Sequence, residues 1–282
     1  MEIKKVGVVG CGLMGSGIAE VCLRSGYPVV VLEVNQELID KGMNALKTSL
    51  DRAVKRGKME EQDRDAALGR LQGTIKIDDF KDCDLVIEAA IENLEEKKKV
   101  FAAVDKVCPS HTVMASNTSC LSILDMAMAT KRPSQVFGMH FFNPVPVMKP
   151  VEIIRTIVSS EETINIAKDF ADSIGKKSIM CKDTPGFIVN RLGVPFLLAS
   201  MRMYDEGLAT KEDIDQGVTL GLNHPMGPLT LSDFLGLDTL YYIACSMYDE
   251  FKDPMFAPPP ILKKMVTAGH LGRKTGKGFY DY

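Results

Sequence analysis

A glycine-rich turn that directly follows a short β-branched run constrains this chain more than any other feature. The run Val6–Val9 is typical of a buried strand, and the sequence Gly10-Cys-Gly-Leu-Met-Gly15 comes immediately after it. Residues 16–24 then have helical spacing, and Tyr27–Leu32 is again β-branched. These segments predict one strand–turn–helix–strand unit, which is the context that the G-x-G-x-x-G motif requires.

Each glycine of the turn has its own physical role. Gly10 permits the tight turn, Gly12 allows a pyrophosphate to approach the backbone, and Gly15 allows the helix to pack closely on the strand. The N–H groups at the start of the helix then bind the anion, so we expect Leu13 and Met14 beside it. A turn that binds nothing is the alternative, and the surrounding strand and helix argue against it. The sequence therefore predicts a dinucleotide site.

Glu33 ends the second strand of this unit, where an acidic side chain can accept hydrogen bonds from the adenosine ribose diol. A carboxylate at this place also repels a 2′-phosphate, which favours NAD over NADP. Asn35 and Lys41 lie nearby and leave the NADP alternative open. Without the glycines upstream, Glu33 would be interpreted as a solvated strand end.

The composition restricts the kinds of partner that the chain can have. The net charge is -3, so no excess of positive charge exists to bind a nucleic-acid backbone or an anionic membrane. The 7 cysteines are scattered and form no C-x-x-C pair, which argues against disulfides and zinc and fits a reducing cytoplasm. The longest apolar stretch, Leu192–Met201, is about half of what a bilayer needs. We therefore expect no metal, no targeting peptide and no membrane span.

Strand-like and helix-like segments alternate up to residue 183. Apolar, strand-like runs lie at 85–87, 112–114, 136–141 and 151–154, and helix-prone segments include 38–56 and 94–106. This alternation predicts an α/β domain at 1–183, with a Rossmann-like, doubly wound and mostly parallel sheet that has helices on both faces.

The pattern changes after the turn Lys182-Asp-Thr-Pro-Gly186. Helical patterns follow with almost no strand signal, and Thr210-Lys-Glu-Asp213 is typical of a capping box at the start of a helix. We therefore predict an all-helical C-terminal domain at 184–282. Its segments 192–201 and 229–242 are more apolar than one small helical layer can bury, which suggests a homodimer or higher homo-oligomer formed through this domain.

Polar residues follow the later strands, at the edge where doubly wound sheets bind their ligands. Ser119 follows the strand around Val113, His140 ends the strand that begins at Val136, and Glu152 comes soon after. Oxidation of a secondary alcohol requires a base for the hydroxyl proton, and an imidazole can take and return a proton near neutral pH. A carboxylate such as Glu152 would fix the tautomer of His140 and stabilise its imidazolium.

Each of these residues also has an ordinary structural interpretation. A histidine at a strand end is more often a buried, hydrogen-bonded residue, and an isolated glutamate is usually a solvated acid. Ser119 fits a helix N-cap, and Asn190 fits a polar position on an apolar helix. The pairing of His140 with Glu152, in a domain that carries a dinucleotide motif, favours the catalytic interpretation.

Four segments together resemble the 3-hydroxyacyl-CoA dehydrogenase family, over essentially the whole chain. They are Ser116-Asn-Thr-Ser119, His140-Phe-Phe-Asn-Pro-Val-Pro-Val-Met-Lys-Pro-Val-Glu152, Lys182-Asp-Thr-Pro-Gly-Phe-Ile-Val-Asn190-Arg191 and Gly272-Arg-Lys274-Thr-Gly-Lys-Gly-Phe-Tyr280. Within the family, the chain resembles the compact bacterial enzymes of butyrate metabolism that act on 3-hydroxybutyryl-CoA. The resemblance implies an NAD-dependent oxidoreductase of fatty acid metabolism that interconverts 3-hydroxyacyl-CoA and 3-oxoacyl-CoA.

The resemblance also implies roles for individual residues. It makes His140 the general acid–base and Glu152 its orienting partner, while Ser119 and Asn190 hydrogen-bond the 3-oxygen of the substrate. It implies that four further residues lie near the cofactor: Glu92, Lys97, Asn143 and Lys274. Taken alone, these are ordinary surface residues. It also implies that Ser49 and Arg56 meet the acyl-CoA, whose phosphates suit a cation.

From this set we expect hydride to pass between C3 of the substrate and the nicotinamide ring, in a cleft between the two domains, while His140 exchanges the hydroxyl proton. Two other functions stay open at this point. One is an NAD-dependent dehydrogenase of a 3-hydroxy acid without CoA, such as a sugar acid. The other is a non-catalytic, crystallin-like protein that keeps the fold and binds the dinucleotide. The complete polar set of Ser119, His140, Glu152 and Asn190 argues against the latter.

Overall fold

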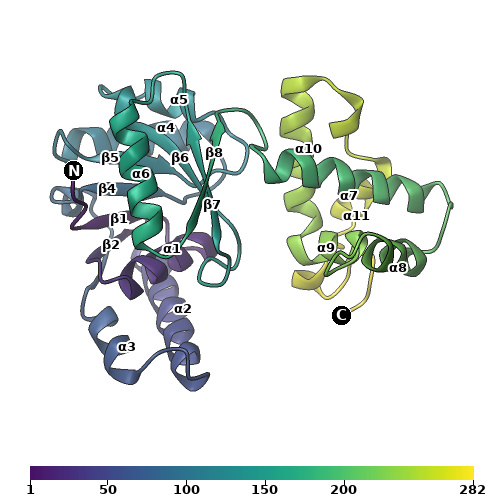
Figure 1. The fold of residues 1–282 in the computed structure, drawn as a ribbon, viewed down its shortest axis with the longest axis horizontal. Coiled ribbons are helices and arrows are strands. Elements are labelled where there is room, and N and C mark those ends of the chain that lie inside the picture. Colours follow the sequence, from purple (N-terminus) through teal and green to yellow (C-terminus); the bar gives the residue numbers. More distant parts are fainter. The chain divides into compact units, whose positions relative to one another are not determined.

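Eight strands form one sheet in the first part of the computed structural model, which describes the whole chain, Met1–Tyr282. They are β1 (Val6–Val9), β2 (Val29–Leu32), β3 (Leu71–Thr74), β4 (Leu85–Glu88), β5 (Val113–Ser116), β6 (Val136–Phe141), β7 (Pro150–Arg155) and β8 (Lys177–Lys182). The strand order is β3-β2-β1-β4-β5-β6-β7-β8, and every neighbouring pair is parallel except β6 and β7. The predicted Rossmann-like, mostly parallel sheet is confirmed (Figure 1).

This first part of the chain has six helices. They are α1 (Leu13–Arg24), α2 (Gln36–Lys55), α3 (Glu61–Leu68), α4 (Leu94–Val107), α5 (Ile123–Met128) and α6 (Glu161–Ser173), with short 3₁₀ turns at Ile77–Phe80 and Pro133–Gln135. All but α3, which packs on α1 and α2, lie around the sheet (Figure 1). Strands β1, β4, β5 and β6 are buried at every residue. A sheet that is covered on both faces requires such continuous apolar strands, which is why the sequence shows runs rather than alternation there.

The direction of the chain reverses between β6 and β7. Only residues 142–149 connect these two strands, and such a short segment cannot make the crossover that a parallel pair needs. The resulting antiparallel register sets His140 directly opposite Glu152. The reversal therefore brings two polar side chains to one place in an otherwise apolar pair of strands.

The chain divides into two units, Met1–Asp183 and Thr184–Tyr282. The second unit is helical, as predicted, and contains α7 (Val189–Asp205), α8 (Lys211–Gly221), α9 (Pro228–Leu235), α10 (Leu237–Phe251) and α11 (Pro260–Thr267), with 3₁₀ turns at Pro254–Phe256 and Arg273–Thr275. Thr210 caps α8, because its hydroxyl accepts the N–H of Asp213 at 3.1 Å. The core of this unit includes Leu198, Leu237 and Met247. None of the helices has the length and apolar character needed to cross a membrane.

Candidate active site

The turn Gly10–Gly15 joins β1 to α1, and α1 begins without a side-chain cap. Gly10 has a φ of +93°, and a Cβ there would lie 2.6 Å from the carbonyl oxygen of Ala89. A Cβ on Gly15 would lie 1.9 Å from the carbonyl oxygen of Gly10, so only glycine permits this close packing. By contrast, nothing lies within 4 Å of a Cβ on Gly12. Open space beside uncapped helical N–H groups fits the pyrophosphate of a dinucleotide.

The carboxylate of Glu33 lies beside this turn. Its Oε1 accepts the N–H of Cys11 at 2.6 Å, and its Oε2 accepts the N–H of Val34 at 3.1 Å. The side chain of Asn35 has a different task, because its Oδ1 caps α2 by accepting the N–H of Leu38 at 2.9 Å. The polar group that faces the glycine turn is therefore an anion, and this favours a ribose diol over a 2′-phosphate.

His140 lies between two partners at the ends of β5, β6 and β7. Its Nδ1 is 2.7 Å from Oε2 of Glu152, and its Nε2 is 3.2 Å from Oγ of Ser119. Directly opposite residues of an antiparallel pair point to the same face, which explains the contact with Glu152. An ionised carboxylate only accepts hydrogen bonds, so Nδ1 carries a proton and Nε2 of the neutral ring accepts from the Ser119 hydroxyl. Nε2 is therefore the atom that can take a proton from a substrate.

The end of β6 is fixed by the loop that follows β5. Asn117 accepts the backbone N–H of Phe141 with its Oδ1 at 2.9 Å, and both residues are buried. The ring of Phe142 packs against the imidazole of His140, with 4.7 Å between the ring centroids. No separate role was predicted for Asn117 from the sequence. The sequence feature that could have marked Asn117 was its position next to Ser116, where β5 ends.

Glu92 and Lys97 form part of a buried network behind Ser119. Glu92 accepts the backbone N–H of Ser119 at 3.0 Å with Oε1, and its Oε2 lies 3.2 Å from Nζ of Lys97. Lys97 is only 1% exposed, so the interpretation of this residue as an ordinary surface charge is wrong. Its Nζ also lies 2.6 Å from Oε1 of Glu88, which sequence reasoning missed. The missed signal was a glutamate that ends an apolar strand at the ligand-binding edge of the sheet.

Comparisons with known proteins agree with this geometry. Residues 5–184 match the family described as "3-hydroxyacyl-CoA dehydrogenase, NAD binding domain", and residues 186–282 match its C-terminal domain. The chain belongs to the 3-hydroxyacyl-CoA dehydrogenase family. Its cofactor is accordingly NAD(H), as predicted.

Members of the family resemble the chain over its full length. The 3-hydroxybutyryl-CoA dehydrogenase of Mycobacterium tuberculosis (strain ATCC 25618 / H37Rv) is 51% identical over 282 residues, which are 99% of each chain. The enzyme of the same name from Clostridioides difficile is 43% identical, again over 99% of each chain. The crystal structure of (S)-3-hydroxybutyryl-CoA dehydrogenase PaaH1 from Ralstonia eutropha has a TM-score of 0.95 and 43% identity, and covers 100% of this chain and 99% of that one.

Ser119 is not a helix N-cap, so the structural alternative for this residue is wrong. Helix α5 begins at Ile123, and its cap is Ser122, whose hydroxyl accepts the N–H of Asp125 at 3.1 Å. Ser119 instead belongs to the loop that precedes this cap, and its hydroxyl faces His140. Its side chain is therefore available for chemistry rather than for helix capping.

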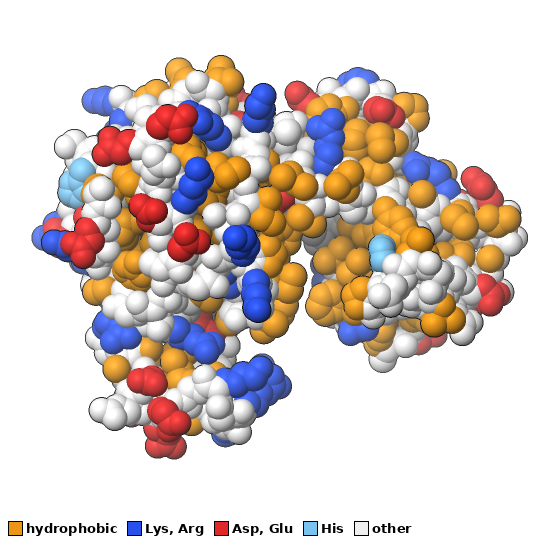
Figure 2. Space-filling view, in the orientation of Figure 1, with side chains coloured by type: hydrophobic (Ala, Val, Ile, Leu, Met, Phe, Trp, Pro, Cys, Tyr) orange, Lys and Arg blue, Asp and Glu red, His pale blue; other side chains and the backbone are white.

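The remaining family positions of the first unit lie outside this network of contacts. Asn143 is exposed in the connection between β6 and β7, next to the cis peptide bond that it forms with Pro144. Ser49 is half-buried on α2, and Arg56 is exposed at the C-terminal end of the same helix. Figure 2 shows Lys and Arg side chains around the α2–α3 end of this unit, with Asp and Glu side chains beside them. The exposed guanidinium of Arg56 is the kind of group that suits phosphates.

Two predicted site residues lie in the second unit. Asn190 is half-buried near the start of α7. Lys274 lies in the 3₁₀ turn Arg273–Thr275, and its Nζ is 2.5 Å from both carboxylate oxygens of Asp238. The roles of Asn190 at the substrate and of Lys274 at the cofactor stay predictions.

Proposed function

We propose that this chain catalyses the reversible, NAD(H)-dependent interconversion of 3-hydroxybutyryl-CoA and acetoacetyl-CoA. Membership of the 3-hydroxyacyl-CoA dehydrogenase family and the names of its full-length relatives support the reaction and the short acyl chain. One observation carries the assignment of the acid–base group: the imidazole of His140 has Glu152 on Nδ1 and the Ser119 hydroxyl beside Nε2.

In the oxidation direction, bound NAD⁺ supplies the acceptor for the hydride that leaves C3 with both electrons of the C–H bond. His140 takes the proton of the 3-hydroxyl group on Nε2, and the C3–O bond becomes a carbonyl. Glu152 stabilises the imidazolium that this transfer creates. In the reverse direction His140 returns the same proton to the oxygen.

Two polar side chains would stabilise the charge that develops on the 3-oxygen. The Ser119 hydroxyl already lies within hydrogen-bond reach of Nε2 of His140, so a substrate oxygen in contact with both groups satisfies the geometry. We propose the amide of Asn190 as a second donor, which is the role that the family resemblance implies for this residue. Donors aimed at an oxygen that gains negative charge contribute about 3 kcal/mol each to catalysis.

The residues that would hold the cofactor fall into two groups. The backbone at Gly12, Leu13 and Met14 would bind the pyrophosphate, and Glu33 would bind the adenosine ribose. The nicotinamide end would be held by Glu92, Lys97, Asn143 and Lys274. Ser49 and Arg56 would meet the CoA moiety, and the exposed cations Lys55 and Lys58 beside Arg56 support this placement.

The test is an assay of the purified chain with NADH and acetoacetyl-CoA, followed by the loss of NADH absorbance. We expect rapid turnover with NADH, slower turnover with NADPH, and the highest kcat/KM for the shortest acyl chains in a series of 3-oxoacyl-CoAs. Oxidation of a sugar acid, with no reaction of CoA esters, would support the non-CoA alternative. Binding of NADH without any turnover would support the crystallin-like alternative.

We also propose that the chain assembles as a homodimer or higher homo-oligomer through its helical unit. Leu192, Leu220 and Leu222 are 73%, 76% and 60% exposed on this unit, and Figure 2 shows hydrophobic side chains on its surface. Large apolar side chains that remain exposed indicate a partner surface. Light scattering during size-exclusion chromatography measures the mass of the assembly directly.

We also propose a cytoplasmic location for the chain. The free state of all the cysteines supports this location.

A further inference from the structure

Three charged side chains lie together behind the loop that carries Ser119. They are Glu88, Glu92 and Lys97, and we call them the Glu88 cluster. Glu88 and Lys97 are each 1% exposed, while Glu92 is half-buried. Removing an ion pair from water carries a desolvation cost that its mutual attraction often fails to recover. Stability alone is therefore a weak reason for placing these charges inside the protein.

The contacts within the cluster lead to the loop 116–119. Nζ of Lys97 lies 2.6 Å from Oε1 of Glu88 and 3.2 Å from Oε2 of Glu92, so the ammonium group joins the two carboxylates. The other oxygen of each carboxylate binds the loop. Oε2 of Glu88 accepts the Ser116 hydroxyl at 2.6 Å, and Oε1 of Glu92 accepts the N–H of Ser119 at 3.0 Å.

Thr118 links these two attachments. Its backbone N–H donates to Oγ of Ser116 at 3.2 Å, and its hydroxyl donates to Glu92. The loop is therefore held at its start through Glu88 and at its end through Glu92. At the end of this loop, the hydroxyl of Ser119 lies 3.2 Å from Nε2 of His140.

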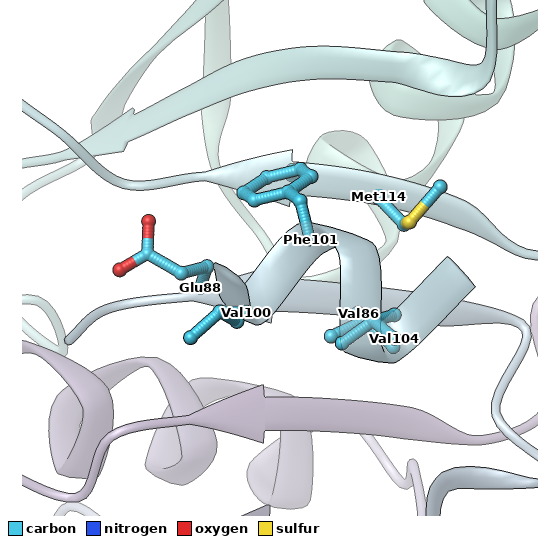
Figure 3. Close-up of a pocket in the computed structure, with 7 residues that line it drawn as sticks. Val86, Glu88, Val100, Phe101, Val104 and Met114 are labelled. Carbon is cyan, nitrogen blue, oxygen red and sulfur yellow. The ribbon is translucent and has the colours of Figure 1, made fainter. Parts of the chain in front are cut away.

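The strand register fixes the position of Glu88. It is the last residue of β4 and pairs in register with Ser116, the last residue of β5. Lys97 belongs to the buried stripe of α4, together with Phe101 and Val104. Figure 3 shows that the carboxylate of Glu88 points away from the apolar side chains of the pocket that β4, β5 and α4 line. The methylene groups of Glu88 pack in that pocket, and its carboxylate oxygens bind the other groups of the Glu88 cluster and the loop.

We infer that Glu88 is a positioning residue for the reaction: through Lys97 and Ser116 it sets the place of the Ser119 hydroxyl relative to His140. The inference rests on the proposed roles of Ser119 and His140. Without the charge of Glu88, the ammonium of Lys97 has Glu92 as its one carboxylate partner in the cluster and moves toward it. Glu92 then shifts, and Ser119 shifts with it because Glu92 accepts the backbone N–H of Ser119. The hydroxyl of Ser116 also loses its charged acceptor.

A double-mutant cycle tests this coupling. We expect Glu88→Gln to lower kcat with acetoacetyl-CoA by about 10- to 100-fold, because a displacement of about 1 Å has effects of that size. Ser119→Ala lowers kcat as well, and the double variant E88Q/S119A is no slower than S119A alone, since Glu88 acts through the hydroxyl that is already missing. A double variant whose loss is the product of the two single losses overturns the inference, and so does an unchanged kcat in E88Q.

The binding of NADH provides a second readout, independent of turnover. Fluorescence titration of the variant Ser116→Ala should give a Kd for NADH within about threefold of the wild-type value, because Ser116, unlike Glu92 and Lys97, has no proposed role at the cofactor. A Kd that rises by as much as kcat falls would show that the link from Glu88 through Ser116 serves the cofactor instead, and would overturn the inference.

Control variants separate positioning from stability. Asp105 also lies on α4 and pairs with Arg132 at 2.7 Å, with both side chains largely buried. Asp105→Asn should lower Tm while kcat stays within about twofold. The double variant E88Q/K97M removes both buried charges, so we expect Tm to recover relative to E88Q while kcat stays low, because Glu92 has lost its anchor. Recovery of kcat together with Tm would show a structural role alone.

The tests also separate this inference from the proposed function. Should E88Q fail to fold, Ser116→Ala breaks only the link between Glu88 and Thr118, and we expect the same non-additive loss with S119A. Additive losses in that cycle overturn the inference. Wild-type turnover of S119A itself would instead contradict the proposed role of Ser119.

Discussion

His140 and Glu152 lie directly opposite each other on β6 and β7, with Nδ1 of the imidazole 2.7 Å from Oε2 of the carboxylate. The contact exists because β7 is antiparallel to β6 in an otherwise parallel sheet. Glu152 is fully buried and His140 is 5% exposed, so the pair is shielded from water. A hydrogen bond from Nδ1–H to the Glu152 carboxylate is stronger in such surroundings, and this bond leaves Nε2 of the neutral imidazole as an acceptor.

The first prediction concerns the charge of Glu152. Glu152→Gln keeps a group of the same shape on Nδ1 but removes the negative charge that stabilises the imidazolium. We expect kcat to fall by about 100-fold or more, within the range that acid–base catalysis contributes. Steady-state rates with acetoacetyl-CoA and NADH measure this. Glu161→Gln is a matched control, because Glu161 is 70% exposed and pairs with Arg155 at the surface. Equal rates in E152Q and E161Q would contradict the role of Glu152.

The second prediction separates two glycines of the same turn. Gly12→Ala adds a methyl group where nothing lies within 4 Å, at a residue with an ordinary φ of −70°, so the fold should tolerate it. The methyl group would occupy the space of the pyrophosphate, and we expect the Kd for NADH to rise by about tenfold or more, which is ~1.4 kcal/mol. Gly15→Ala should instead lower Tm, because its Cβ would meet the Gly10 carbonyl at 1.9 Å. Unchanged NADH affinity in G12A argues against a cofactor at this turn.

The third prediction concerns the choice of cofactor. Glu33→Ser removes the carboxylate that lies against the N–H of Cys11, and with it the repulsion of a 2′-phosphate. The ratio of kcat/KM with NADPH to kcat/KM with NADH should rise by about tenfold or more. Asn35→Ala is the control: it removes the cap of α2 and should lower stability by about 1 kcal/mol without changing the ratio. A constant ratio in E33S means that Glu33 does not meet the ribose.

The fourth prediction follows from the pKa of Asp84. Burial opposes ionisation of this carboxyl, but the N–H of Lys4, the ring of His111 and the N–H of Lys5 outweigh burial and hold its pKa below the usual 3.8. A lowered folded-state pKa stabilises the fold above the unfolded pKa, and this contribution is lost as the pH falls through the folded-state pKa. Asp84→Asn should therefore lower the free energy of unfolding by about 1 kcal/mol at neutral pH.

Urea unfolding of D84N and wild type at two pH values checks this. The difference in unfolding free energy should shrink as the pH falls below 3.8 and through the lower folded-state pKa of Asp84, where the carboxyl becomes protonated in both states. Asp82→Asn is the control, because Asp82 is 65% exposed and reaches only Lys5, at 3.9 Å. A difference of the same size at both pH values would mean that the Asp84 charge does not contribute.

Much of the first unit was predictable because its signals are local. The buried strands β1, β4, β5 and β6 have continuous apolar runs, and the glycine turn lies where a strand ends and a helix begins. By contrast, β8 at the edge of the sheet has the polar sequence Lys177-Ser-Ile-Met-Cys-Lys182, and each of its residues is exposed or half-buried. Neither β8 nor the other edge strand, β3, was predicted from the sequence, because an edge strand lacks the apolar run of a covered strand.

The pairing of His140 with Glu152 was predictable from chemistry, and the Glu88 cluster was not. Lys97 lies in the run Glu95-Glu-Lys-Lys-Lys99, and such charge runs are usually solvated. Its burial becomes visible only from its helical spacing to Phe101 and Val104, which lie on the same buried face of α4. The partner Glu88 comes from another element altogether, and contacts of that kind depend on the tertiary fold.

The central claim is that His140 carries the proton of the reaction, and the variant His140→Gln tests it most directly. Stopped-flow mixing of the variant with NADH and acetoacetyl-CoA should show NADH binding with a wild-type Kd. Turnover should then be slower by about 100- to 10,000-fold, because only the proton-transfer group is lost. Turnover of H140Q at the wild-type rate would contradict the account.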